Sequence, residues 1–172
     1  KLLISEIQTA STISVHDEFV ELYNPNDTEV ALDGWYVQKK TKSGSSFSTF
    51  APASLFAGRS IAPHSYLVIA HPSSTIPHDV ASDNGIANNN TIAVKNPQRE
   101  ITDKVGYGEA GDCEGECAVQ PEPGTSILRK VAEGAPQDTD QNGADFEIQT
   151  CPSPGAPSAP CEALSSSSST VT

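Results

Sequence analysis

The sequence contains no methionine, a single tryptophan and no long hydrophobic run. A membrane-spanning helix needs about 20 consecutive apolar residues, and no segment approaches that length, so we expect no membrane span in this chain. The hydrophobic content of 36% is low, as in proteins whose strands expose one face to water. Since the chain starts at Lys1 and lacks methionine, we expect a processed or trimmed polypeptide without its signal peptide.

Positive charge is also scarce, because 10 Lys and Arg residues stand against 22 Asp and Glu residues and the net charge is −12. Contacts from Lys and Arg to phosphates supply most nucleic-acid affinity, so we expect no nucleic-acid partner. The one basic cluster, residues 39–42 (KKTK), is predicted to be a solvated hairpin tip. An acidic surface suits solubility, a saline environment or calcium binding.

Catalytic motifs are missing as well. The serines show no GxSxG motif, and Glu6, Glu18 and Glu21 are not accompanied by a nucleophile or a phosphate-binding glycine loop. We therefore assign these glutamates a structural role and predict that the chain is not an enzyme. Three histidines recur every seven residues, but neighbouring prolines exclude a helix and an odd step reverses the face of a strand. The three histidines, His64, His71 and His78, are therefore predicted to be surface residues and not zinc ligands.

Turn residues and short alternating segments are abundant. Twelve glycines and 13 prolines indicate many turns and few helices. About nine strands are predicted, at residues 2–8, 17–23, 35–39, 47–50, 66–71, 91–95, 101–107, 126–131 and 146–149. The length of 172 residues suits one domain with one hydrophobic core.

Five motifs occur in a characteristic order: LLISE at 2–6, DEFVELYN at 17–24, LDGW at 32–35, PHSYLVIA at 63–70 and DTDQNGADF at 138–146. Together they resemble the lamin tail domain of the bacterial, extracellular type. The resemblance implies an all-β, immunoglobulin-like β-sandwich, and a role as an adhesive or accessory module rather than an enzyme. The predicted core comprises the inward-facing side chains of the strands, namely Val20, Leu22, Trp35, Val37, Leu67 and Ile69.

We expect the sandwich to occupy residues 1–157 and a Ser/Pro/Ala-rich flexible tail or linker to occupy residues 158–172. Four cysteines form two sequence-local pairs, Cys113/Cys117 and Cys151/Cys161, for which disulfides are the simplest interpretation. A four-thiolate zinc site is the alternative, although CxxC spacing is absent. Disulfides would place the protein outside the cytoplasm, secreted or on the cell surface.

The sharpest chemical motif places oxygen-bearing side chains at Asp138, Asp140, Asn142 and Asp145, with a glycine at 143. This pattern is similar to the start of a calcium loop, although an EF-hand would require Glu where Gln149 stands. The alternative is a structural turn in which these side chains bind backbone N–H groups.

The function predicted from these features is a non-catalytic extracellular module for attachment, display or scaffolding, forming part of a larger protein. Its expected partner is a protein or a cell-surface polymer. The alternative function is a calcium-stabilised module that binds carbohydrate or another surface, with calcium as the one cofactor considered.

Overall fold

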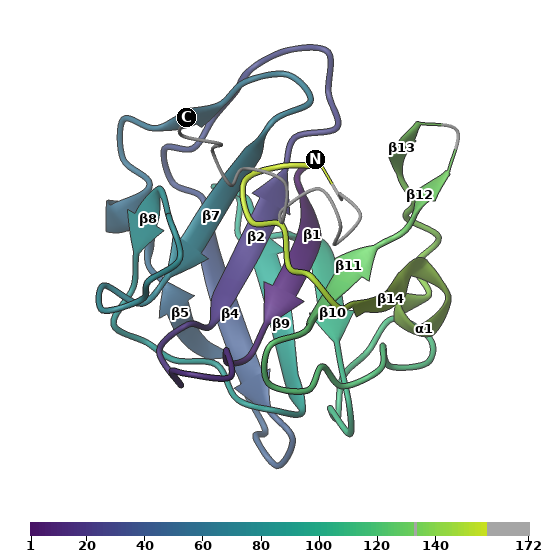
Figure 1. The fold of residues 1–172 in the computed structure, drawn as a ribbon. Helices are drawn as coiled ribbons and strands as arrows, with labels where there is room; N and C mark the ends of the chain where they lie inside the picture. The colour runs from purple at the N-terminus through teal and green to yellow at the C-terminus, as the bar shows by residue number, and fades with distance from the viewer. Residues whose placement is uncertain (133, 158–172) are drawn as a thin grey trace, which may run out of the picture.

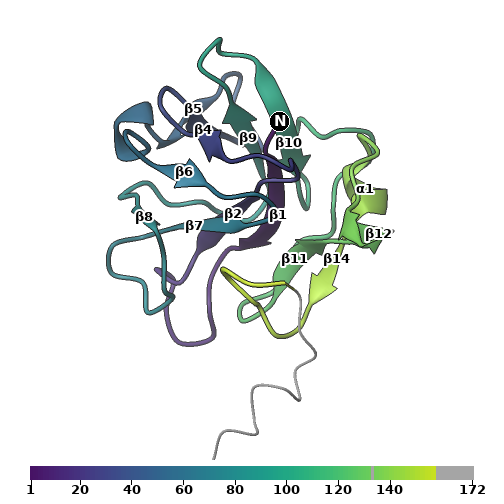
Figure 2. The ribbon, with the colours of Figure 1, turned by 90° about the horizontal axis from the view of Figure 1, so that it is seen from above.

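The computed structural model describes residues 1–132 and 134–157, which form two facing β-sheets (Figures 1 and 2). The larger sheet has six strands in the order β14-β11-β1-β2-β7-β8. Neighbouring strands are antiparallel except for β7 and β8, which are parallel. Its strands are β1 (Leu3–Gln8), β2 (Phe19–Tyr23), β7 (Tyr66–Ala70), β8 (Val80–Ala81), β11 (Ser126–Arg129) and β14 (Phe146–Gln149).

The second sheet has four antiparallel strands in the order β10-β9-β4-β5. These are β4 (Tyr36–Thr41), β5 (Ser48–Ala51), β9 (Asn90–Lys95) and β10 (Ile101–Gly106). Two short pairs join β3 (Val30–Ala31) to β6 (Ser60–Ile61) and β12 (Val131–Ala132) to β13 (Ala135–Pro136). The two helices in the described residues are the 3-10 helix η1 (Ala53–Leu55) and the one-turn α1 (Asn142–Asp145).

The predicted all-β, immunoglobulin-like sandwich is confirmed. Each of the nine predicted segments overlaps a strand, and the elements that were not predicted are the short ones. Two-residue strands and one-turn helices carry too few residues to show a periodicity in sequence. The predicted tail at 158–172 lies outside the described residues.

The hydrophobic core fills the space between the two sheets. Val20 and Leu22 of β2 and Leu67 and Ile69 of β7 face Val37 of β4, and all five are at most 4% exposed. This burial confirms that part of the predicted core, and it follows from the inward-facing alternation of sandwich strands.

Trp35 departs from the prediction because its side chain is only partly buried and packs against the core from outside. It follows Gly34, which turns the chain with φ +83° and lies against Pro97. Because Trp35 precedes β4, it lies at the edge of the sandwich and not within the layer of inward-facing side chains.

A β-bulge changes the facing of side chains in β1. The pairing of β1 with β2 shifts register between Ile4 and Glu6. Strict alternation would place Ile4 and Glu6 on one face, but Ile4 and Ile7 both enter the core. The extra residue of the bulge, Ser5, separates the inward Ile4 from Glu6, which joins Glu21 on the outer face of the sheet.

Candidate functional site

Two buried carboxylates occupy the outer face of the larger sheet. Glu6 and Glu21 are paired across β1 and β2, and each is 0% exposed. The hydroxyl of Ser126 donates to Glu6 Oε1 at 2.5 Å, and that of Ser5 donates to Glu21 Oε1 at 2.5 Å. The sheet itself therefore supplies a donor to each carboxyl group.

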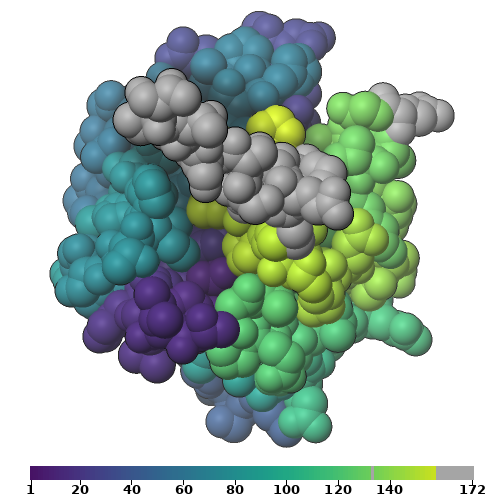
Figure 3. All heavy atoms as spheres, viewed as in Figure 1, coloured from purple at the N-terminus to yellow at the C-terminus, as the bar shows by residue number. Residues whose placement is uncertain are grey.

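A segment from the end of the described chain supplies the other donors. The backbone N–H of Ser153 lies 3.1 Å from Glu6 Oε1, and that of Gly155 lies 2.6 Å from Glu21 Oε2. Figures 1 and 3 show this segment, in yellow, lying across the outside of the sheet. We call residues 152–157 the strap. Glu6 and Glu21 thus hold the strap on the sheet, which is the structural role expected for them.

Burial changes the protonation of these carboxyl groups. Burial raises the pKa of Glu21 to about 8, more than the hydrogen bonds from Ser5 and Gly155 lower it, and the nearby carboxylates of Glu6 and Asp79 raise it further. Burial also raises the pKa of Glu6. Both carboxyl groups therefore retain their protons to a higher pH than solvent-exposed glutamates do.

A second buried group is organised by an arginine of β11, next to α1. Arg129 of β11 is 2% exposed, and its Nε donates to the carbonyl oxygen of Ile4 at 2.8 Å. Its guanidinium lies 2.7 Å from Asp103, 3.3 Å from Asp138 and 3.7 Å from Asp145. Burial raises the pKa of Asp103 despite the attraction of Arg129. Sequence reasoning missed this centre, although a lone arginine in the apolar strand segment SILR was a usable signal.

Two residues of the predicted calcium loop, Asp138 and Asp145, form ion pairs with this arginine. Asp145 accepts hydrogen bonds from Thr139 N at 2.8 Å, Thr139 Oγ1 at 2.6 Å and Gln137 Nε2 at 2.8 Å. Burial alone would raise the pKa of Asp145, but these hydrogen bonds and a longer one from Gln141 hold it below its ordinary value. The Asp145 carboxylate therefore serves the turn that carries it.

Asn142 connects three segments of the chain. Its Oδ1 accepts from Gly106 N at 2.9 Å and from Glu114 N at 3.0 Å, and its Nδ2 donates to Lys104 O at 2.9 Å. Asp140, by contrast, is exposed and has φ 55°. The side-chain oxygens of Asn142 and Asp145 thus bind backbone N–H groups, as the structural-turn alternative expects.

A different acidic group gathers beside the arginine. Ligand oxygens of Asp103, Glu114 and Asp138 lie within 4.8 Å of one another. Burial, followed by the charges of Asp103, Asp140 and Asp138, raises the pKa of Glu114 to about 7. Of the four predicted calcium ligands, Asp138 alone belongs to this group.

The described residues include both cysteines of only one of the two predicted disulfides. Cys113 and Cys117 form a disulfide with an S–S distance of 1.97 Å, as expected. A Cβ atom at Gly106 would lie 2.3 Å from Cys113 Sγ, so glycine allows this loop to approach β10. The expected pairing of Cys151 with Cys161 is untested because Cys161 lies outside the described residues.

The three regularly spaced histidines lie in separate environments. His64 bonds to Asp27 at 3.0 Å and to the Tyr23 hydroxyl at 3.4 Å. His71 stacks on His16 with ring centroids 4.3 Å apart, while His78 bonds to the carbonyl of Ile76. Each of the three imidazoles therefore has its own contact partners.

The sequence model described as Lamin Tail Domain matches residues 1–109. The chain belongs to the lamin tail domain family. A comparison with curated proteins finds no significant match. The lamin tail domain match runs from β1 through β10 and ends before Arg129 and α1. The family is one of structural, immunoglobulin-like modules. None of the described helices is long and apolar enough to cross a bilayer.

Proposed function

We propose that this lamin tail domain is a non-catalytic extracellular module that attaches, displays or scaffolds within a larger secreted or cell-surface protein. The supporting observation is that three of its fully buried carboxyl groups serve the fold. Glu6 and Glu21 hold the strap, and Asp145 holds the turn before β14. These carboxyl groups are committed to structural hydrogen bonds, which favours a binding role over acid–base chemistry.

The proposed location rests on the Cys113–Cys117 disulfide. Disulfides persist in oxidising compartments and are rare in the cytosol. The proposed partner is a protein or a polymer of the cell surface, and the net charge of −12 disfavours nucleic acid.

Attachment can be tested with a fluorescent protein fused to the chain and incubated with intact cells of the source organism and with their isolated wall polymers. We expect saturable retention on at least one of them. The fluorescent protein alone and a fusion carrying Leu22→Asp, which disrupts the core, serve as controls. Retention equal to that of these controls would remove the attachment function.

The second candidate, a calcium-stabilised surface- or carbohydrate-binding module, is favoured by the group of Asp103, Glu114 and Asp138. Calcium takes six to eight oxygen ligands. The group offers three carboxylates, two of which already form ion pairs with Arg129, so the fit is partial.

Thermal unfolding with millimolar Ca²⁺ and with chelator tests this candidate. At a free concentration of about 100 Kd, a bound ion adds about 2.7 kcal/mol to the free energy of unfolding. Loss of that shift in Glu114→Gln but not in Asp140→Ala would place the ion in the acidic group, and the reverse would place it in the loop predicted from sequence. Identical melting of the wild type in both buffers would exclude calcium stabilisation.

A further inference from the structure

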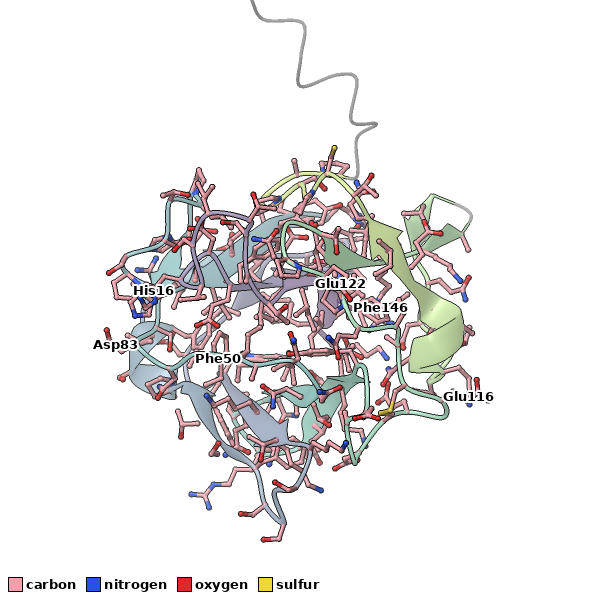
Figure 4. The ribbon with its side chains drawn as sticks, turned by 60° about the horizontal axis from the view of Figure 1, so that its bottom comes forward. His16, Phe50, Asp83, Glu116, Glu122 and Phe146 are labelled. Carbon is pink, nitrogen blue, oxygen red and sulfur yellow. A yellow bond between two sulfur atoms is a disulfide. The ribbon has the colours of Figure 1, made fainter. Side chains whose placement is uncertain are left out.

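A pocket of about 440 Å³ opens at the end of the sandwich where the β1–β2 and β8–β9 loops meet. Its lining includes Val15 and His16 from the first loop, Asp83 and Ile86 from the second, and His71, which follows β7. Figure 4 shows His16 and Asp83 on the same side of the molecule. None of the residues that line the pocket belongs to the strap or forms an ion pair with Arg129.

A buried carboxylate belongs to this pocket. Glu18 is 7% exposed and lines the cavity. Its Oε2 accepts from Ile86 N at 3.0 Å, whereas its Oε1 has no hydrogen-bond partner within the described chain. In the same residues no fully buried side-chain oxygen is left unsatisfied, so Oε1 must be reached from the pocket. A desolvated carboxylate oxygen gains most from a charged donor.

The second loop leaves room above that oxygen. A Cβ atom at Gly85 would lie 2.8 Å from Glu18 Oε1, closer than such atoms approach in proteins. The Lys39 ammonium donates to the carbonyl oxygen of Gly85. No ion pair to Glu18 occurs in residues 1–132 and 134–157. Glycine at 85 therefore keeps Glu18 Oε1 accessible. Within the described residues, no cationic side chain forms an ion pair with the Glu18 carboxylate.

The histidines at the rim favour an organic cation over a metal ion. The rings of His16 and His71 are stacked with an interplanar angle of 25°, and His71 Nδ1 already accepts from Ser73 N at 3.0 Å. Ring-nitrogen lone pairs lie in the ring planes, so stacked rings do not direct them to one point as a metal site requires. A stacked imidazole does offer its face to a cation.

Part of the remaining lining is apolar. Val15 is 73% exposed, and Ile86 forms part of the wall next to the Glu18 contact. An exposed valine beside a buried carboxylate suits a ligand that carries its charge on a short hydrocarbon body. The acidic rim residue Asp83 and the net charge of −12 would attract such a ligand.

We propose that this pocket binds a primary ammonium group, with the ammonium on Glu18 Oε1 and its carbon stem against Val15 and Ile86. Lysine side chains and amino sugars share this chemistry. The inference deepens the proposed attachment function and rests on it for its biological role, because it names the chemical group on the partner.

The experiment is a titration of the ¹⁵N-labelled chain, followed through the amide signals of Ile86 and Ala87. The ligands are Nα-acetyl-lysine methylamide and glucosamine, each matched with its N-acetylated counterpart, which lacks the charge. We expect saturable shifts with at least one amine and binding weaker by roughly tenfold or more with its acetylated form. Saturation by the lysine derivative alone indicates a protein partner, and saturation by glucosamine alone indicates an amino sugar.

Two variants test the geometry. Glu18→Gln removes the charge while keeping an acceptor for Ile86 N, and Gly85→Ala crowds Oε1 while keeping the charge. Both should weaken amine binding roughly tenfold or more, while the exposed Glu29→Gln should not change it. Unchanged amide signals from β4 and β9 establish that each variant folds. If Glu18→Gln does not fold, Gly85→Ala provides the test.

Equal binding of amine and acetylated ligand, no saturable shift, or unchanged binding by a folded variant of Glu18 or Gly85 would overturn the ammonium site. If cell retention persists in that case, the attachment function stands and this pocket is not its site. Loss of both would remove the two proposals together.

Discussion

Replacing Glu21 with glutamine should stabilise the protein at neutral pH and reduce the dependence of its stability on pH. Glu21 is fully buried between Ser5 and the strap, and its pKa is raised from 4.5 to about 8. A carboxyl group whose pKa is raised by folding stabilises the native state fully below its unfolded pKa. That contribution is lost as the pH rises from about 4.5 towards 8. Glutamine does not titrate and retains an oxygen acceptor.

The size of the effect follows from the two pKa values. Each pKa unit corresponds to about 1.4 kcal/mol, so Glu21 should lower the free energy of unfolding by about 2–3 kcal/mol between pH 5 and pH 7. For a domain of this length, that loss corresponds to a fall in Tm of roughly 5–10 °C. The raised pKa values of Glu6, Glu18 and Glu114 act in the same direction over this range. The wild type should therefore melt at a lower temperature at pH 7 than at pH 5.

Denaturant unfolding at several pH values, for the wild type, Glu21→Gln and Glu29→Gln, measures this effect. Glu29 is exposed, so its variant should follow the wild-type curve. The Glu21→Gln curve should be flatter between pH 5 and pH 8. A wild-type stability that stays level or rises from pH 5 to pH 7 would refute the reasoning, as would parallel curves for the wild type and Glu21→Gln.

Four further outcomes are expected. Asp145→Ala should lower the free energy of unfolding by about 3 kcal/mol, measured by denaturant unfolding, because it removes the acceptor of two bonds from Thr139. Trp35→Ala should cost about 1–3 kcal/mol in the same assay, less than a fully buried tryptophan, because the side chain is only partly buried. Serine at both Cys113 and Cys117 should cost about 2 kcal/mol, the chain-entropy value for so short a loop, with amide exchange increasing in that loop. Gel-shift titration with duplex DNA at physiological salt should show no complex, because the net charge is −12.

The fold was readable from sequence wherever a strand was long enough to show alternation. Val20 and Leu22 facing the core, with Phe19 and Glu21 opposite, follow from period-two alternation alone. The same reasoning failed in β1, because a bulge is a backbone irregularity that the pattern LLISE does not reveal. Trp35 was placed among the inward-facing side chains of the strand predicted at residues 35–39, but β4 begins at Tyr36 and the position of Trp35 before it limits its burial.

The sites depended on contacts between distant parts of the chain. Glu6 accepts a hydrogen bond from Ser153, and Arg129 donates one to Asp103. No local sequence pattern indicates either contact. The motif around Asn142 was recognised as a candidate loop, but its hydrogen bonds reach Gly106. Topology decides these partners, and topology was inferred only at the level of a sandwich.

The position of β1 at the centre of the larger sheet has a mechanical consequence. β1 pairs antiparallel with both β2 and β11, and β11 pairs antiparallel with β14, so β1 and β14 run in the same direction. The start of β1 and the end of β14 therefore lie at opposite ends of the sheet. Tension applied between these points pulls along the strands, at right angles to the hydrogen bonds that join them. Those bonds are loaded in shear, so they must break together and not one after another. The domain should therefore resist stretching along this axis more strongly than a hairpin whose strands are pulled apart from one end.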